Sequence, residues 1–423
     1  MIFVLACYGT RGDVEPGLAL GRELLRRGHE VRIAVPPDLV EFAQAAGLPA
    51  VPYGMDTQTW MNLHRDLWAS IVRNFWKVPH LIELGRGLFG VYSQCWHAVS
   101  TTLVALADGA DVLITGRGLQ EPAVNVAEYY DLPLVTLHFA PSRAHGQFVP
   151  FMAGVGRAAM AMNLWLAWRM TKKVEDEQRR ELGLPKATSS TFRRVSENGS
   201  LEIQAYDECC FPGLAAEWTK WLHQRPFVGA LTMELATDVD EELAAWISAG
   251  EPPIYFGFGS IPVESAAGTV GMISAACAQL GQRALICAAG TDVSHVPRSD
   301  HVKIVGTMNH AALLPACRAV VHHGGAGTTA AGLRAGVPTL ILWTAADQPM
   351  WGMQIKRLKL GSSRSFSSTT QQTLTEDLRA ILAPEFASRA REFATRMTTP
   401  TESVTAATDL VEDSARCVGA SSH

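Results

Sequence analysis

Residues 319–349 read AVVHHGGAGTTAAGLRAGVPTLILWTAADQP, and this stretch decides the expected fold. Its apolar beginning, residues 319–321, predicts a short buried strand. Gly324, Gly325 and Gly327 follow, and glycines let the backbone turn tightly and approach a bulky group closely. The stretch therefore predicts a strand that ends in a glycine-rich turn.

A helix and a second strand are expected after this turn. Residues 328–335 have a helix-forming composition, Gly336 suits the C-terminal cap, and Pro338 prevents continuation. Residues 337–343 are the next apolar run and predict a strand. A strand, a glycine turn and a helix N-terminus together favour anion binding, because free backbone N–H groups and the positive end of the helix dipole point at one spot.

Polar side chains at two points of this stretch suit a phosphorylated sugar. His323 lies where it could donate a hydrogen bond to a phosphate oxygen. Asp347 and Gln348 follow the second strand, and an acid beside an amide is suited to binding adjacent sugar hydroxyls. Packing glycines and a helix cap by Thr328 would explain the turn, but not His323 together with Asp347 and Gln348. The simplest ligand that fits is a sugar joined to a diphosphate.

Two motifs resemble one known family. The ordered pattern of residues 323–329 with Asp347 and Gln348 resembles the nucleotide-sugar signature of GT-B glycosyltransferases. The similarity is greatest to the bacterial branch that glycosylates natural products and glycolipids, which includes glycopeptide-antibiotic and sterol glucosyltransferases. Residues 10–16, TRGDVEP, resemble the opening signature of the same branch. The resemblance covers most of the chain and implies an α/β fold of two facing Rossmann-like, doubly wound parallel-sheet domains with a cleft between them.

The first part of the chain independently indicates a parallel sheet. Residues 2–7 and 31–35 predict buried strands. A helix is expected to connect them, starting in the turn at residues 8–16 with Pro16 in its first turn. This β-α-β rhythm is typical of parallel sheets covered by helices.

The expected domain boundaries follow from these patterns. Residues 1–228 are expected to form an N-terminal Rossmann-like acceptor-binding domain, and residues 251–395 a C-terminal Rossmann-like nucleotide-sugar-binding domain. Residues 229–250 are expected to link the two. Two helical stretches are expected beyond Ser367, and a C-terminal helix in residues 396–423 is expected to cross back to the N-terminal domain.

The resemblance also assigns roles to individual residues. Asp13 matches the general base of the glycopeptide branch, although it could instead only cap the first helix. His138 is the reserve candidate for the base. The other assignments are the diphosphate ligands Ser260, His323, Gly325, Gly327 and Thr328, the nucleobase contacts Thr307 and Met308, and the sugar ligands Asp347 and Gln348. The resemblance implies no cofactor and no metal, because these groups stabilise the leaving diphosphate electrostatically. The implied donor is a UDP-sugar, above all UDP-glucose, or a dTDP-sugar.

The tryptophan-rich segment at residues 55–101 bears on the acceptor. Trp60, Trp68 and Trp76 either belong to the core or form, with His138, the wall of an acceptor pocket. Aromatic rings suit both roles, because they bury a large apolar area.

Residues 148–170 are almost wholly apolar and approach the length of a membrane span. Pro150, Gly154 and Gly156 interrupt the segment, which argues against a span. The segment therefore either lines an apolar acceptor pocket or contacts a membrane peripherally, and the sequence does not separate these two hypotheses.

The composition bounds the class of the protein. The chain has 423 residues, of which 18% are charged and 48% hydrophobic, so we expect a globular protein of two or three domains. A net charge of −5 without a basic cluster argues against nucleic acid as a partner. The eight cysteines show no zinc-binding spacing, and Asp238-Val-Asp240 fits a helix cap better than a metal-binding DxD pair. The apolar strand at the start is not a signal peptide, so we expect a cytoplasmic protein, membrane-associated if residues 148–170 contact lipid.

The sequence thus predicts an inverting, metal-independent hexosyltransferase that acts on a hydroxyl of an apolar acceptor, such as a natural product, lipid, sterol or phenol. Two alternatives stay open: a catalytically silent glycosyltransferase-like partner protein, and a nucleotide-sugar epimerase of the same fold. A dehydrogenase is disfavoured, because the N-terminal turn lacks GxGxxG and Pro36-Pro37 stands where a ribose-binding acid is expected. The acceptor, the nucleobase, the choice between glucose and a 6-deoxyhexose, and the oligomeric state are not determined by the sequence.

Overall fold

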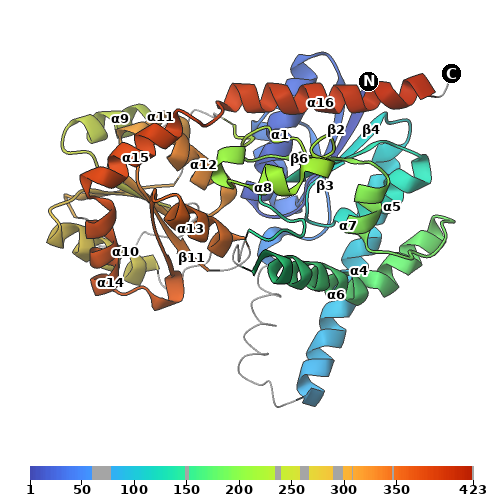
Figure 1. Ribbon diagram of the computed structural model, residues 1–423, viewed down its shortest axis with the longest axis horizontal. Coiled ribbons are helices and arrows are strands. Elements are labelled where there is room, and N and C mark those ends of the chain that lie inside the picture. The colour runs from blue at the N-terminus through green and yellow to red at the C-terminus, as the bar shows by residue number, and fades with distance from the viewer. Residues whose placement is uncertain are drawn as a thin grey trace. The chain divides into compact units, whose positions relative to one another are not determined.

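The computed structural model describes residues 1–59, 78–147, 152–233, 240–257, 266–288, 299–306, 308–344 and 347–421. The chain forms two compact units (Figure 1). The first contains Met1–Ala205, Gly213–Leu231 and Thr401–His423, and the second contains Tyr206–Pro212 and Thr232–Pro400. The chain therefore crosses between the units four times, and neither unit is one continuous segment.

The first unit contains a six-stranded sheet of parallel strands, in agreement with the sequence pattern. Its order is β3 (Ala50–Pro52), β2 (Glu30–Val35), β1 (Ile2–Ala6), β4 (Val112–Thr115), β5 (Leu134–His138) and β6 (Leu201–Gln204). Its helices are α1 (Arg11–Arg26), α2 (Val40–Ala45), α4 (Val78–Ala107), α5 (Gln120–Tyr130), α6 (Ala153–Glu181), α7 (Thr191–Glu197), α8 (Leu214–Glu217) and nearly all of α16 (Pro400–Ser421).

The C-terminal helix α16 is joined to the first unit by ion pairs. Arg27, at the end of α1, contacts Asp409 at 2.6 Å, and His29 Nε2 lies 2.9 Å from Glu412 Oε1. Glu412 is mostly buried, and its contacts with His29 and Arg27 outweigh the burial penalty and lower the pKa of its carboxyl. These pairs place the last helix of the chain beside the first one.

The start of α1 differs from the prediction. The helix begins at Arg11, so Pro16 lies in its second turn and not in its first. The reason is a capping box: the backbone N–H of Thr10 donates to Asp13 Oδ2 at 2.8 Å, and Thr10 Oγ1 donates to the same oxygen at 2.9 Å. A capping box satisfies backbone donors at the helix start and so fixes where the helix begins.

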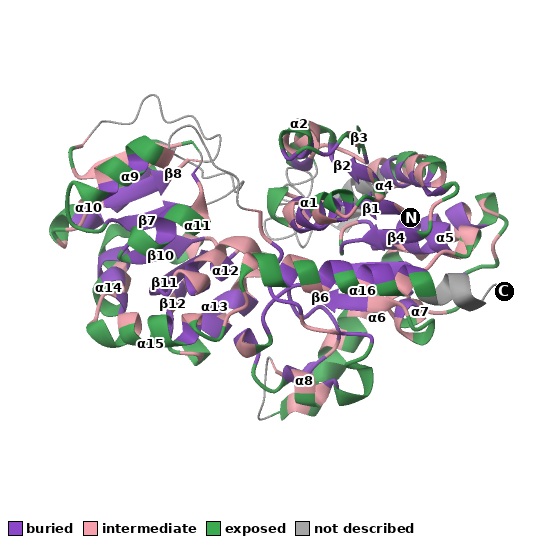
Figure 2. Ribbon diagram, turned by 90° about the horizontal axis from the view of Figure 1, so that it is seen from above, coloured by how far each residue is buried: buried purple, intermediate pink, exposed green. Residues whose placement is uncertain are grey.

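The second unit repeats this architecture. Its six parallel strands have the order β12 (Gly361–Ser365), β11 (Thr339–Trp343), β10 (Ala319–His322), β7 (Ile254–Gly257), β8 (Ala284–Cys287) and β9 (Val302–Val305). Its helices are α9 (Asp240–Ser248), α10 (Ala266–Gln279), α11 (His310–Leu313), α12 (Ala326–Arg334), α13 (Gln348–Arg357), α14 (Gln371–Ile381) and α15 (Pro384–Ala394). The strands of both sheets are largely buried (Figure 2).

Alternate residues of the central strands enter two separate cores. Ile254 and Phe256 of β7 pack in one core with residues of α10 and α14. Tyr255, between them, packs in another core with Leu243 of α9 and Leu313 of α11. Helices therefore cover both faces of the sheet, which explains why its central strands are continuous apolar runs.

The C-terminal part of the chain departs from the sequence expectation. Beyond Ser367 the chain forms three helices instead of two, because Pro384 and Pro400 each begin a new helix. The helix whose cap was expected at Asp238-Val-Asp240 is present: residues 240–248 of the expected linker form α9, and two of its residues are buried in the second unit.

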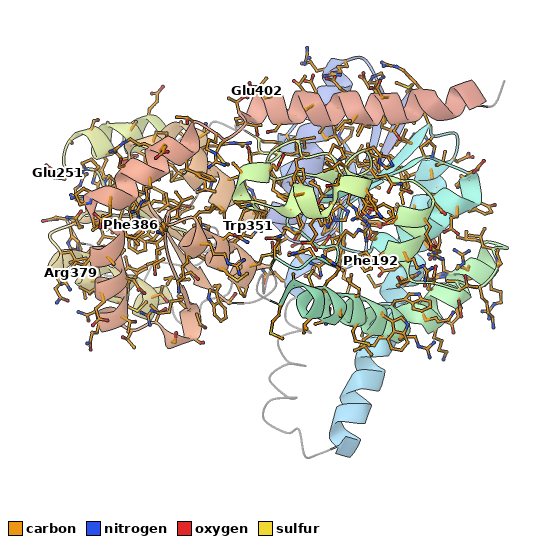
Figure 3. All side chains as sticks on the ribbon, in the orientation of Figure 1. Phe192, Glu251, Trp351, Arg379, Phe386 and Glu402 are labelled. Atoms are coloured by element: carbon orange, nitrogen blue, oxygen red, sulfur yellow. The ribbon has the colours of Figure 1, made fainter. Side chains whose placement is uncertain are left out.

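Residues 206–212 belong to the second unit, although the segments on both sides of them in the sequence belong to the first; we call them the strap. Tyr206 and Phe211 pack edge-on against Trp351 of α13, with ring centroids 6.4 and 5.0 Å away; Trp351 is labelled in Figure 3. Asp207 Oδ1 accepts hydrogen bonds from the backbone N–H and the hydroxyl of Thr398, both at 2.7 Å. The strap thus fastens α13 and the segment that precedes α16.

Among the residues that the structure describes, no helix combines the length and the apolar character that crossing a bilayer requires.

Candidate functional site

Both signature motifs leave their sheets at a reversal of strand order. Numbered within each unit, the order is 3-2-1-4-5-6, so it reverses between β1 and β4 and between β7 and β10. Open α/β sheets bind ligands beyond the carboxyl ends of the strands at such a reversal. The turn that leads to Asp13 follows β1, and the glycine turn follows β10. The topology therefore favours both turns as binding elements.

The glycine turn is packed against the Asp347-Gln348 turn. Gly324 has φ +97°, a left-handed conformation that favours glycine. A Cβ at this position would lie 2.8 Å from Ile341 Cγ2 and 3.1 and 3.3 Å from Gln348 Cβ and Cα. The two halves of the sequence pattern, about twenty residues apart in the chain, are thus brought into direct contact.

His323 lies beside the first turn of α12. Gly325 is the N-cap residue of this helix, and a Cβ added to it would lie 2.5 Å from His323 Nε2. Burial lowers the pKa of His323, and the Gly257 carbonyl acts in the opposite direction. A lowered pKa favours the neutral ring, whose single N–H can donate either to the Gly257 carbonyl or to a ligand at the helix start.

The N-terminus of α12 presents backbone donors. The N–H groups of Ala326, Gly327 and Thr328 have no acceptor inside the helix, because its first such bond runs from the Thr329 N–H to the Gly325 carbonyl at 2.9 Å. In the described part of the chain, no atom outside the backbone of α12 lies within 4 Å of a Cβ built on Gly327. The helix end, its dipole and His323 together can bind an anion.

His322 also holds the glycine turn in place, a role that was not expected from the sequence. It is the last residue of β10 and fully buried, and its Nδ1 accepts a hydrogen bond from the Gly324 N–H at 3.0 Å. Burial lowers the pKa of His322 well below its ordinary range, which keeps Nδ1 available as an acceptor. The only signal for this role in the sequence is the position of His322 immediately before the glycines.

Asp347 and Gln348 lie at the start of α13, and both are partly exposed. Gln348 Oε1 accepts hydrogen bonds from the Thr344 N–H at 2.8 Å and from its hydroxyl at 3.0 Å. The carbonyl side of this amide therefore holds the end of β11 in place.

The expected nucleobase contacts are only partly described. Thr307 lies outside the described residues, as does the diphosphate candidate Ser260. The Met308 side chain is buried in the core that contains Leu313. Asp240, at the start of α9, accepts a hydrogen bond from the Asn309 N–H at 3.0 Å, so it positions the segment that carries Met308. Asp238, its neighbour in the DxD sequence, lies outside the described residues.

Asp13 is held against the turn after β1. Its carboxylate is fixed by Thr10 as described above, and a Cβ added at Gly9 would lie 2.4 Å from Asp13 Oδ2. The side chain is partly exposed at the carboxyl end of the sheet. Asp13 thus caps the helix with a carboxylate that is partly exposed.

His138 is fixed inside the first unit. It is 1% exposed, and its Nε2 and Nδ1 lie 2.9 Å from Thr136 Oγ1 and 2.7 Å from Ser142 Oγ. Burial, reinforced by the charge of Arg143, lowers the pKa of His138 well below its ordinary range. These contacts favour a structural role over the reserve role as base. Trp60, Trp68 and Trp76 lie outside the described residues.

Comparison with known proteins identifies the family. Residues 3–89 match the glycosyltransferase family 28 N-terminal domain, and residues 275–413 match the C-terminal domain of the erythromycin biosynthesis protein CIII-like family. An uncharacterized glycosyltransferase of Mycobacterium leprae (strain TN) is 58% identical over 98% of this chain and 97% of its own length. The chain belongs to the GT-B glycosyltransferases.

A plant enzyme and two solved structures are also similar to this glycosyltransferase. A sterol 3-beta-glucosyltransferase of Arabidopsis thaliana is 30% identical over 91% of this chain and 64% of its own length. The calicheamicin glycosyltransferase CalG4 superimposes with a TM-score of 0.70, 19% identity and coverage of 99% of this chain and 98% of its own. The glycosyltransferase VinC, solved in complex with dTDP, has a TM-score of 0.63, 20% identity and coverage of 98% and 100%. At these identities the two structures show the fold alone. Family membership establishes that this glycosyltransferase transfers a sugar from a nucleotide-sugar.

Proposed function

We propose that this glycosyltransferase transfers a hexose from a UDP- or dTDP-sugar to a hydroxyl of an apolar acceptor, with inversion at the anomeric carbon and with Asp13 as the general base. The observation that carries the donor half of the proposal is the contact between the Gly324 turn and Gln348, at the carboxyl end of a reversal in strand order. The dTDP bound by VinC and the sterol acceptor named for the plant relative support the two substrate classes.

The leaving diphosphate is stabilised by donors that are already oriented. In the proposal, the N–H groups at the start of α12 and the His323 ring bind its oxygens, with the Thr328 hydroxyl beside them. Ser260 joins them from the segment after β7, the strand next to β10. Because the donors are fixed before the bond breaks, they stabilise the developing charge without reorganisation. Asp347 and Gln348 bind hydroxyls of the sugar, and the backbone near Thr307 and Met308 contacts the nucleobase.

Asp13 takes the proton of the acceptor hydroxyl as the oxygen attacks the anomeric carbon. The C–O bond to the acceptor forms while the bond from the sugar to the diphosphate breaks, and the proton moves to the carboxylate. A carboxylate is a weak base towards an alcohol, so proton transfer is late in the reaction. Both hydrogen bonds from Thr10 go to Asp13 Oδ2.

Binding of the donor nucleotide is tested by thermal unfolding with UDP, dTDP, GDP and NAD. A nucleotide at 100 times its Kd adds about 2.7 kcal/mol to the stability of the folded state, so UDP or dTDP should raise Tm. The His323→Ala variant is the matched control and should show a smaller rise with the same nucleotide. A rise with NAD alone, or none with any nucleotide, contradicts the proposed donor.

Inversion is tested by the configuration of the product. If Asp13 and the diphosphate act on opposite faces of the sugar, one in-line displacement should convert an α-linked donor into a β-glycoside. The H1–H2 coupling constant in the NMR spectrum of the product distinguishes the two anomers. An α-glycoside as the product would refute single displacement.

A further inference from the structure

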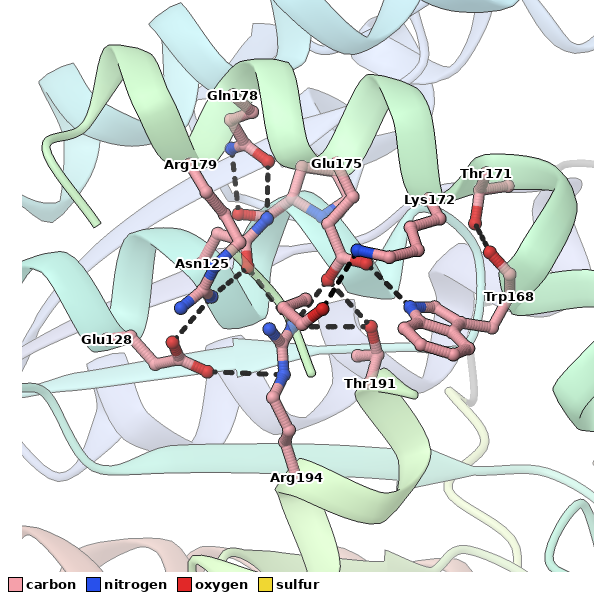
Figure 4. A network of polar contacts seen from close by, with 12 residues as sticks. Asn125, Glu128, Trp168, Thr171, Lys172, Glu175, Gln178, Arg179, Thr191 and Arg194 are labelled. Atoms are coloured by element: carbon pink, nitrogen blue, oxygen red, sulfur yellow. Dashed lines mark hydrogen bonds and ion pairs between the residues drawn. The ribbon is translucent and has the colours of Figure 1, made fainter. Parts of the chain in front are cut away.

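Helix α6 has two halves with opposite surroundings. Its C-terminal half is anchored by buried polar contacts (Figure 4). Glu175, fully buried, accepts hydrogen bonds from Trp168 Nε1 at 2.8 Å and from Arg194 Nη2 at 2.6 Å. Gln178 Oε1 accepts from Trp96 Nε1 of α4 at 2.7 Å and from Asn125 Nδ2 of α5 at 2.8 Å. Three other helices therefore fix this half in place.

The N-terminal half carries large apolar side chains in water. The exposed ones are Met152 (48%), Val155 (59%), Met162 (56%), Trp165 (48%), Leu166 (50%) and Met170 (78%). They are half of the twelve large hydrophobic residues that are exposed in the described part of the chain. Contiguous apolar patches of this kind mark interaction sites in soluble proteins. We call residues 152–173 the apolar stripe.

The apolar side chains fall largely on one side of the helix. Val155, Met162, Leu166 and Met170 are spaced by seven, four and four residues, which places them on one face. Trp168 points away from this face and is buried through its bond to Glu175. The anchored half thus holds the stripe with its apolar face outward.

The charge of the stripe has one sign. Residues 152–173 contain two arginines and two lysines and no acid, whereas the whole chain has a net charge of −5. Arg157 is paired with Glu217 and Lys172 with Asp176. Arg169 is exposed and lies over the Trp165 ring, 5.9 Å from its centroid, and Lys173 is exposed one turn further on. Arg169 and Lys173 follow Leu166 by three and seven residues, so they lie at the C-terminal end of the apolar face. Cations at the end of an apolar face complement an anionic lipid surface, where tryptophan also prefers to lie.

We propose that the apolar stripe of α6 docks this glycosyltransferase on the surface of an anionic lipid bilayer. The helix lies in the plane of the headgroups, with Met162, Leu166 and Met170 inserted among the acyl chains and with Arg169 and Lys173 at the phosphates. An interfacial helix needs an apolar face and a basic border but not the length of a span, which agrees with the properties of α6. The proposal depends on neither the identity of the donor nor the role of Asp13.

Vesicle flotation with the full chain tests the proposal. One set of vesicles contains phosphatidylcholine alone and the other also contains phosphatidylglycerol. The wild type should float with the phosphatidylglycerol vesicles, and the bound fraction should fall as salt is added, because salt screens the charges. The double variant Trp165→Glu/Leu166→Glu should lower the partition coefficient at least about tenfold, because it places two charges in the inserted face.

Tyr129→Glu is the matched control. Tyr129 lies on α5 outside the stripe and is 47% exposed, close to the 48% of Trp165, so this variant should bind vesicles like the wild type. All variants should keep the wild-type Tm, because the changed side chains lie outside the buried network. Failure of the wild type to bind phosphatidylglycerol vesicles, or unchanged binding by the double variant, would overturn the proposal. If the wild type does not float but the double variant raises KM for a dissolved apolar acceptor, the stripe belongs to the acceptor site instead.

Discussion

Replacing Asp13 with asparagine should lower the rate of sugar transfer by about 10³-fold, within the range that general bases contribute, and should leave donor binding unchanged. The amide has the size of the carboxylate and can still accept the two hydrogen bonds from Thr10, so the start of α1 should persist. It cannot take a proton from the acceptor at neutral pH. Initial rates at saturating donor, together with the nucleotide-induced change in Tm, measure the two effects separately.

Thr10→Val is the matched control for the capping role of Asp13. It removes the hydroxyl donor and the side-chain cap but keeps the carboxylate, so it should cost about 1 kcal/mol of stability and lower transfer far less than Asp13→Asn. If Asp13→Asn turned over at the wild-type rate, Asp13 would be a helix cap only. If the rate of sugar transfer fell equally in both variants, transfer would depend on the conformation of the turn and not on Asp13 as a base.

Replacing Gly324 with alanine should destabilise the second unit by about 3 kcal/mol and remove donor binding. Part of this cost is the left-handed backbone, and the rest is the overlap of the new methyl group with Ile341 and Gln348. Relief of the overlap requires the glycine turn to separate from the Asp347-Gln348 turn. Denaturant unfolding measures the stability, and the thermal shift with UDP or dTDP measures the donor site.

Gly327→Ala provides the comparison for Gly324→Ala. Gly327 is helical, and among the residues that the structure describes a Cβ there meets no atom of another segment within 4 Å, so alanine should stabilise the chain by about 0.5–1 kcal/mol. If Gly327→Ala lost as much stability as is expected for Gly324→Ala, the turn would tolerate no substitution at all. The loss in Gly324→Ala could then not be attributed to its left-handed backbone and to the overlap with Ile341 and Gln348. If nucleotide binding survived in Gly324→Ala, contact between the two turns would not be needed for the donor site.

The sequence predicts the elements that have strong local signals. The strand at β10, the glycine turn and the end of α12 at Gly336 follow from an apolar run, three glycines and a proline, and each occurs in the structure. The parallel sheet follows from the alternation of strands and helices, because only crossover connections join parallel neighbours. Contact between the two turns of the donor site follows from neither signal, since it depends on how β10 and β11 pack.

Edge strands and exposed helices were harder to predict. Two of the edge strands, β6 and β12, have the sequences LEIQ and GSSRS, which lack a continuous apolar run. In β6 the polar Glu202 is nevertheless fully buried, because Arg143 and Arg225 pair with it, and such a strand is not predicted by apolar periodicity. The environment of residues 152–170 was left open between two hypotheses, because a helix that is apolar and exposed has the same sequence as one that is apolar and buried. The position of Pro16 was wrong because the Thr10–Asp13 capping box dominates the start of α1.

The strap formed by residues 206–212 has a consequence for recombination between relatives of this glycosyltransferase. A chimera made by one cut near Thr232 would take its donor-binding sheet from one parent and its strap from the other. Trp351 would then meet foreign aromatic partners, and Thr398 would depend on a foreign acid at the position of Asp207. Substrate preferences can therefore be exchanged as modules only when the strap comes from the same parent as the second sheet. The last helix must come from the same parent as the first sheet. Such an exchange needs a crossover at each of the four points where the chain passes between the units.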